Sequence, residues 1–217
     1  MVSSDQGSGV FILASGFSVA LVRRPCFVLA MFVVAALLQP AFGHDGTTLP
    51  YGSFLSGLTH PVLGLDHFLA MVSVGILSAQ MGGRAIWTVP ATFVLIMAVG
   101  GLLGWIDVGL SAIEVGIAFS VLALGTAIAL DKKLPMVAVM SAVGVFAIFH
   151  GYAHGAEMPL AATALTYALG FMTGTALLHI MGVIIGDISQ QYERGKLLLR
   201  GAGVLIAGTG AAYLIGA

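Results

Sequence analysis

The sequence predicts an all-α protein, a polytopic membrane helix bundle with six transmembrane helices after a cleaved signal peptide. Of its 217 residues, 59% are hydrophobic and 8% are charged, and the mean hydropathy is +1.07. This composition differs strongly from that of soluble domains. The apolar residues also gather in stretches long enough to cross about 30 Å of hydrocarbon as helices, which satisfy their own backbone hydrogen bonds there.

The N-terminal segment has the pattern of a secretory signal. Arg23 and Arg24 precede the apolar run 26–38, and small residues follow at Ala41 and Gly43. We expect cleavage after Gly43, which divides the chain into a signal peptide, 1–43, and a six-helix transmembrane domain, 44–217. The alternative is an uncleaved anchor helix. Cleavage would remove the single cysteine, Cys26, and leave the mature chain without a disulfide or a thiolate ligand.

Six further apolar stretches follow, and we expect each to form a transmembrane helix. They cover residues 61–81, 85–105, 113–130, 135–149, 160–186 and 197–217. The fourth stretch is short, so its helix should continue to about His154 and place its histidines at the membrane edge. Glycine pairs at four-residue spacing predict close helix packing. These pairs are Gly100 with Gly104, Gly151 with Gly155, Gly170 with Gly174, and Gly182 with Gly186.

The basic residues after position 43 all lie in or beside alternate connections between these stretches. They are Arg84, Lys132, Lys133, Arg194, Lys196 and Arg200. The positive-inside bias places these connections in the cytoplasm and both mature termini in the periplasm. The chain is therefore expected to be a multi-pass protein of the inner membrane, with lipid as its surroundings. A net charge of −1 with eight basic residues excludes an electrostatic surface for nucleic acid.

Histidines and carboxylates gather at the ends of the stretches that should face the periplasm. The group is His44, Asp45, His60, Asp66, His67, Asp107, Glu114, His150, His154 and Glu157. An ionisable residue at the centre of a membrane costs about 3 kcal/mol and tends to mark a pathway. The group therefore favours ion handling over a purely structural role. Asp107 is expected in a solvated loop, whereas Glu114 fits either a loop or the mouth of a path.

The first stretch begins with His60 and Pro61. Proline suits the first position of a helix, so we expect His60 to cap this helix at the membrane surface and His67 to lie two turns deeper. Residues 60, 64, 67, 71 and 75 would form one stripe. Seven residues rise about 10 Å, too far for both histidines to bind one ion unless the helix breaks between them, so we expect them to mark successive stations. Asp66 either orients another ligand or binds from a distorted turn.

The fourth stretch carries the clearest ligand pattern. His150, His154 and Glu157 share one helical face, and histidines four residues apart can chelate a single ion. His179 lies deeper in the fifth stretch and is either a hydrogen-bonded packing residue or a station that passes the ion onward. If the signal is cleaved, His44 becomes the N-terminal residue, whose amine and imidazole can together bind a metal.

Imidazole and carboxylate without thiolate suit the borderline ions Ni(II), Co(II), Zn(II) and Cu(II). The ligand types do not distinguish among these metals. The metal is expected as a transported substrate, and no prosthetic group is expected. No nucleotide-binding fingerprint occurs in the sequence, which favours facilitated diffusion or secondary transport, with histidine protonation assisting release.

Three motifs resemble those of the HupE/UreJ family of small membrane permeases. The first is His60-Pro-x-x-Gly-x-Asp66-His67, which continues through Met71, Gly75, Gln80, Gly82 and Gly83. The others are Phe149-His150-Gly151 with His154, Gly155 and Glu157, and Ala176-Leu177-Leu178-His179 with Gly182. The resemblance implies nickel or cobalt transport and a functional link to hydrogenase, urease or cobalamin metallation. It assigns metal handling to His60, Asp66, His67, His150, His154 and Glu157.

We therefore expect a permease that imports nickel or cobalt from the periplasm to the cytoplasm and has no catalytic residues. One alternative is an intramembrane zinc hydrolase in which His67, His150 and His154 hold the zinc and a carboxylate activates water. Another is an electron-transfer protein that binds haem through pairs of histidines.

Overall fold

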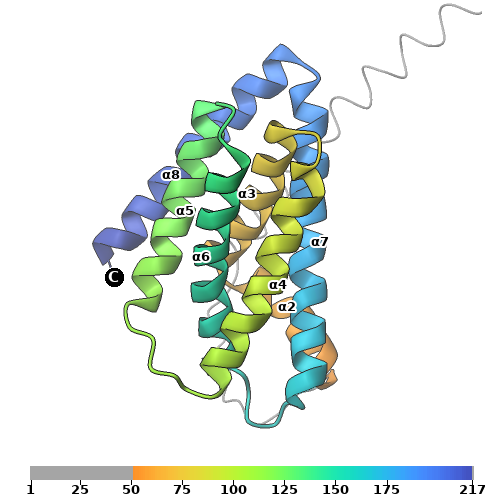
Figure 1. Cartoon of the computed structure of the whole chain (residues 1–217), viewed down its shortest axis with the longest axis vertical. Helices are drawn as coiled ribbons and strands as arrows, with labels where there is room; N and C mark the ends of the chain where they lie inside the picture. Colours follow the sequence, from red (N-terminus) through yellow and green to blue (C-terminus); the bar gives the residue numbers. More distant parts are fainter. Residues whose placement is uncertain (1–50, 217) are drawn as a thin grey trace, which may run out of the picture. The chain divides into compact units, whose positions relative to one another are not determined.

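A computed structural model of the chain describes residues 51–216. The predicted signal peptide, its cleavage after Gly43 and the predicted metal ligand His44 therefore lie outside the described residues. Within 51–216 every regular element is a helix, which confirms the all-α prediction (Figure 1). The helices are α2 (Gly52–Leu63), α3 (Leu65–Met81), α4 (Ala85–Trp105), α5 (Ile113–Leu130), α6 (Met136–Ala156), α7 (Ala164–Gln190) and α8 (Glu193–Gly216).

Five of these helices, α4 to α8, are long and apolar enough to cross a membrane. The shorter helices α2 and α3 pass the same test together, with a bend of 85° between them, which is the geometry of either a broken sixth span or a re-entrant loop. Many large apolar side chains of the long helices face outward, including Leu95, Val145 and Leu205. Such side chains are stable against lipid, so this part of the chain is a multi-pass membrane bundle.

The helices pack most extensively in four pairs: α4 with α6, α5 with α8, and α7 with both α2 and α3. Glycines make these approaches close. A Cβ at Gly104 would collide with the Tyr152 carbonyl of α6, and one at Gly151 would collide with the Met97 carbonyl of α4. The other predicted pairs act likewise in α7, where Gly170 and Gly174 face α2 and Gly182 and Gly186 face α3. The predicted role of the glycine pairs is confirmed.

The observed ends of three helices can be compared with the ends of the apolar stretches that predicted them. Helix α6 continues to Ala156, as predicted from the need to span the membrane. Helix α7 is shifted by four residues relative to the predicted stretch at both ends. Helix α8 begins at Glu193, inside the charged segment before the predicted stretch. An acidic residue in the first turn favours helix initiation, so the helix extends beyond its apolar part.

The first stretch is not the single straight helix that we expected. Pro61 lies in the last turn of α2, so it does not begin a helix, and His60 does not cap one. Gly64 separates α2 from α3 in an extended conformation, with φ −97° and ψ 122°. Asp66 then stabilises the start of α3, because its Oδ1 accepts the backbone N–H of His67 at 2.8 Å. The predicted stripe is therefore interrupted at Gly64.

The three connections that carry or adjoin the basic residues gather at one end of the bundle. They join α3 to α4, α5 to α6 and α7 to α8, and all lie at the upper end in Figure 1. The connections from α4 to α5 and from α6 to α7 lie at the opposite end, near the C-terminal end of α6 that carries His154. The basic residues are therefore segregated to one end of the bundle, as the sequence predicts.

Candidate metal centre

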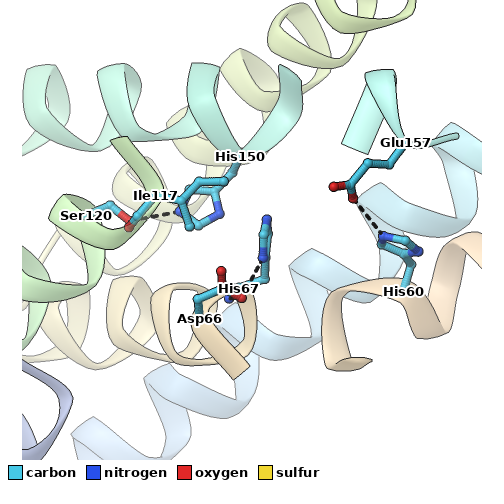
Figure 2. Close-up of polar contacts among 7 residues, drawn as sticks. All are labelled: His60, Asp66, His67, Ile117, Ser120, His150 and Glu157. Carbon is cyan, nitrogen blue, oxygen red and sulfur yellow. Dashed lines mark hydrogen bonds and ion pairs between the residues drawn. The ribbon is translucent and has the colours of Figure 1, made fainter. Parts of the chain in front are cut away.

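One group of potential metal ligands lies where α2 meets the end of α6. His60 of α2, His154 of α6 and Glu157, which follows α6, offer ligand atoms that all lie within 4.8 Å of one another. The Nε2 atom of His60 is 3.9 Å from Oε2 of Glu157, and 58% of the Glu157 side chain is exposed (Figure 2). We call these three residues the mouth cluster. Two imidazoles and a carboxylate form a suitable ligand set for a borderline divalent metal.

His154 connects this cluster to deeper histidines. Its ring centroid is 4.7 Å from that of His60 and 4.2 Å from that of His67. The His67 ring is in turn 4.8 Å from the ring of His150. The bend at Gly64 makes this arrangement possible, because it allows His60 and His67 to approach the same ring from two helices. A break therefore lies between the two histidines, which is the condition under which both could approach one ion.

We call His67, His150 and His179 the inner histidines. In two of them an acceptor fixes one ring nitrogen: His67 Nδ1 is 2.8 Å from Oδ1 of Asp66, and His179 Nδ1 is 2.8 Å from the Met71 carbonyl oxygen. These oxygens only accept, so Nδ1 carries the hydrogen in both rings. Both Nε2 atoms are buried and have no partner within residues 51–216. Each therefore keeps a lone pair available for a metal.

His150 is held differently, through a hydroxyl group. Its Nε2 is 2.8 Å from Oγ of Ser120 in α5, and that Oγ is also 2.7 Å from the Ile117 carbonyl oxygen (Figure 2). The Nδ1 atom of His150 has no partner in the described part of the chain. His154 has neither ring nitrogen paired there, although the residue is only 5% exposed. The mouth and the interior thus share a row of unpaired imidazole nitrogens.

A phenylalanine separates the deepest histidine from the others. The Phe93 ring of α4 is fully buried, with its centroid 5.6 Å from that of His150 and 5.1 Å from that of His179. His179 therefore lies beyond an apolar ring and not in the mouth cluster. The hydrogen bond from its Nδ1 to the Met71 carbonyl oxygen is what a packing role for His179 predicts. Its Nε2, however, is unpaired within residues 51–216.

The remaining predicted polar residues lie around this row. One oxygen of Asp66 accepts two hydrogen bonds from His67, from its backbone N–H and its ring Nδ1–H, which is the geometry that an orienting role needs. Together with the exposed Glu114, Asp66 lines a cavity of about 300 Å³ beside α5 and α8. Asp107 is exposed in the connection after α4, as expected, where the Tyr152 hydroxyl lies 3.4 Å from its Oδ1. The Met71 side chain is part of the core.

Sequence reasoning missed two residues that contact the inner histidines, Ser120 and Phe93. Neither gives a distinctive signal. A serine in an apolar stretch ordinarily bonds a carbonyl of its own helix, and a phenylalanine there is indistinguishable from lipid-facing or core residues. Their contacts with histidines come from the way α5 and α4 pack against α6.

Comparison with known proteins identifies the family of this chain. The family model described as "HupE / UreJ protein" matches residues 29–213. The chain is 41% identical over 184 residues to Protein HupE of Rhizobium leguminosarum bv. viciae, an alignment that covers 84% of this chain and 95% of that protein. No solved structure shows a significant match. The match to the family model and the extent of this similarity show that the chain belongs to the HupE / UreJ protein family.

Proposed function

We propose that the chain is a permease of the inner membrane that imports a divalent transition metal, nickel or cobalt, from the periplasm to the cytoplasm. The observation that carries the proposal is the row of unpaired imidazole nitrogens that begins at the mouth cluster and continues through the inner histidines. Buried polar atoms without partners are costly in a membrane and need an explanation. A passing metal ion with a preference for imidazole supplies one.

The path begins where a hydrated ion meets the least buried ligands. Glu157 and His60 capture it together with His154, and His154 passes it to His67, whose ring is adjacent. From there the ion moves to His150 and, past Phe93, to His179. Spacing of about 4 to 5 Å between successive rings from His60 to His150 lets a new ligand bind before the previous one leaves, whereas the last step to His179 passes the Phe93 ring.

The arrangement of charge supports import as the direction of transport. The mouth cluster lies at the end of the bundle opposite the basic connections, which the positive-inside bias assigns to the cytoplasm. This orientation places both mature termini in the periplasm. Transport is then facilitated diffusion or secondary transport, and the imported metal supplies enzymes such as hydrogenase or urease, or cobalamin. The metal is cargo, and no prosthetic group or catalytic residue takes part.

The test is accumulation of radioactive nickel and cobalt in cells that lack their own transporters for these metals. We expect uptake with the wild-type chain and a decrease of at least about tenfold with His67→Ala, because a ligand lost from the row leaves its neighbours without a partner. Gln80→Ala is the control, since it also removes a partly buried polar side chain from α3, at the end away from the mouth. No uptake by inserted wild-type protein, or full uptake by His67→Ala, would contradict the proposal.

One observation favours a second candidate, a zinc-dependent hydrolase. Two histidines and a glutamate form a known ligand set of catalytic zinc, and the mouth cluster has this composition. A catalytic site retains its metal during purification, whereas a transport site exchanges it. Stoichiometric zinc in protein that has been purified and dialysed would favour the hydrolase, and its absence together with nickel or cobalt uptake would favour the permease.

A further inference from the structure

Ser120 and His150 form a buried contact that the transport path does not by itself require. Both residues are completely buried, and the Oγ of Ser120 in α5 is 2.8 Å from Nε2 of His150 in α6. The same Oγ is 2.7 Å from the carbonyl oxygen of Ile117, one turn earlier in α5 (Figure 2). The serine therefore links the backbone of one helix to a ring on the next.

The hydrogens of this link can be assigned by counting donors. A hydroxyl group has one hydrogen, and the Ile117 carbonyl can only accept. The Ser120 hydrogen therefore points to Ile117, and a lone pair of Oγ faces His150. Nε2 of His150 must then donate, which leaves Nδ1 without a hydrogen. The opposite assignment would place an N–H at Nδ1, which is buried without an acceptor within residues 51–216.

The neighbouring histidines give this assignment its significance. His67 Nε2 and His179 Nε2 keep free lone pairs because Asp66 and the Met71 carbonyl hold the opposite ring nitrogens. His150 would likewise have one ring nitrogen, Nδ1, with a free lone pair. Histidines that bind metals commonly donate their other N–H to an acceptor, which sets both the tautomer and the ring orientation.

We infer that Ser120 is a positioning residue that fixes His150 in the Nε2–H tautomer and thereby presents Nδ1 to the transported metal. This inference rests on the proposed function for the identity of the metal, whereas the tautomer is a property of the metal-free protein. Ser120 does not bind the ion. It acts through His150, and removing its hydroxyl frees the ring to change tautomer and to rotate.

The matched variants are Ser120→Ala, Ser120→Thr and Ser78→Ala. Threonine keeps an Oγ atom that can bond the helix carbonyl and the ring. Ser78 is the control because it is equally buried and its Oγ donates to the Gly75 carbonyl at 2.7 Å. Ser78→Ala therefore removes the same kind of hydrogen bond within one helix without touching a histidine.

Two measurements on purified protein in lipid nanodiscs test the inference. Nitrogen-15 NMR of histidine-labelled, metal-free protein reports the His150 tautomer, with its signals assigned by their loss in His150→Asn. Calorimetric titration with nickel ion alone reports affinity. In the wild type and in Ser120→Thr we expect a protonated Nε2 and an unprotonated Nδ1. In Ser120→Ala we expect mixed tautomers and about 10–100-fold weaker nickel binding, with Ser78→Ala unchanged.

The inference is overturned if Ser120→Ala retains the wild-type tautomer, or if its tautomers mix while nickel affinity is unchanged. It is also overturned if the wild-type protein already has Nδ1 protonated. These outcomes differ from failure of the proposed function. A wild-type protein that binds nickel through His150 but accumulates none in cells would refute the permease while the role of Ser120 stands.

Discussion

The mouth cluster and the inner histidines use the same chemical group in opposite settings. His60 and Glu157 are partly exposed, and 3.9 Å separates their closest ligand atoms. His67, His150 and His179 are buried, and each has one ring nitrogen held at 2.8 Å by another group of the protein. Within residues 51–216 the mouth cluster has candidate ligands without supporting hydrogen bonds, whereas the inner histidines have supporting hydrogen bonds and no convergent third ligand.

This difference suits two stages of transport. Side chains at the surface can rearrange around a hydrated ion at little cost, because water replaces any contact that they lose. Inside the bundle no such replacement is available, so ring orientation must be set in advance. His154 belongs to the mouth cluster by position and contacts the inner group at His67. It is the ring at which the two stages meet.

The largest decrease in nickel uptake is expected from a substitution that disrupts both the mouth cluster and its connection to the inner histidines. His154→Ala removes a ligand from the mouth cluster and the neighbour of His67 at once, so nickel uptake should fall roughly 100-fold, at the upper end of effects seen when the support of a metal ligand is lost. Initial uptake rates measure this. Tyr152→Phe is the control, because it alters a buried polar side chain in the same helix. An uptake rate of His154→Ala near that of the wild type would show that His154 is not part of the transport path.

A second change should disturb the mouth and spare the interior. At Gly57 a Cβ would collide with the Tyr167 carbonyl of α7, so Gly57→Ala should displace α2 and destabilise the protein by about 1–3 kcal/mol. We expect a lower unfolding temperature and weaker nickel binding, with the His150 tautomer preserved. Gly201→Ala, where a Cβ would meet nothing within 4 Å, is the control. An altered His150 tautomer would show that the two regions are not independent.

The smallest effect should come from the most exposed ligand. Glu157→Gln removes a charge from a side chain that is 58% exposed. Exposed charge pairs contribute about 0–1 kcal/mol, so the KM for uptake should rise no more than about fivefold while the maximal rate is kept. The rise should shrink at high salt, where screening weakens the attraction. Glu193→Gln is the control. It changes an exposed side chain at the other end of the bundle and should leave both the KM and the maximal rate of uptake unchanged. A decrease in the maximal rate would contradict this prediction, because it would show that Glu157 also acts in a step after capture of the ion.

The helices and their packing were predictable because the relevant signals are local. Gly100 and Gly104, and Gly151 and Gly155, lie four residues apart in two stretches, and this spacing alone marks the faces on which α4 and α6 approach each other. The prediction for the end of α6 was met in part, because His154 and the following Glu157 lie together with His60 in the mouth cluster, whereas His150, expected on the same face, lies with the inner histidines. In contrast, apolar stretches did not give the ends of α7 and α8, because α7 begins inside its stretch and continues beyond it, and α8 begins before its stretch.

The bend and the supporting hydrogen bonds were not predictable in the same way. Pro61 suits the first turn of a helix but is tolerated in the last turn of α2, and local sequence does not decide between these positions. The Ser120 hydrogen bond depends on the packing of α5 against α6, between residues 30 positions apart. No periodicity within either helix contains that information.

Helix α7 gives the two halves of the first span a common mechanical support. Gly170 and Gly174 bear on α2, Gly182 and Gly186 bear on α3, and His179 lies between these two contacts on the same continuous helix. Neither half can slide freely along α7, because backbone meets backbone at each contact. Any change in the tilt of α7 would therefore move α2 and α3 together, and with them His60 and His67.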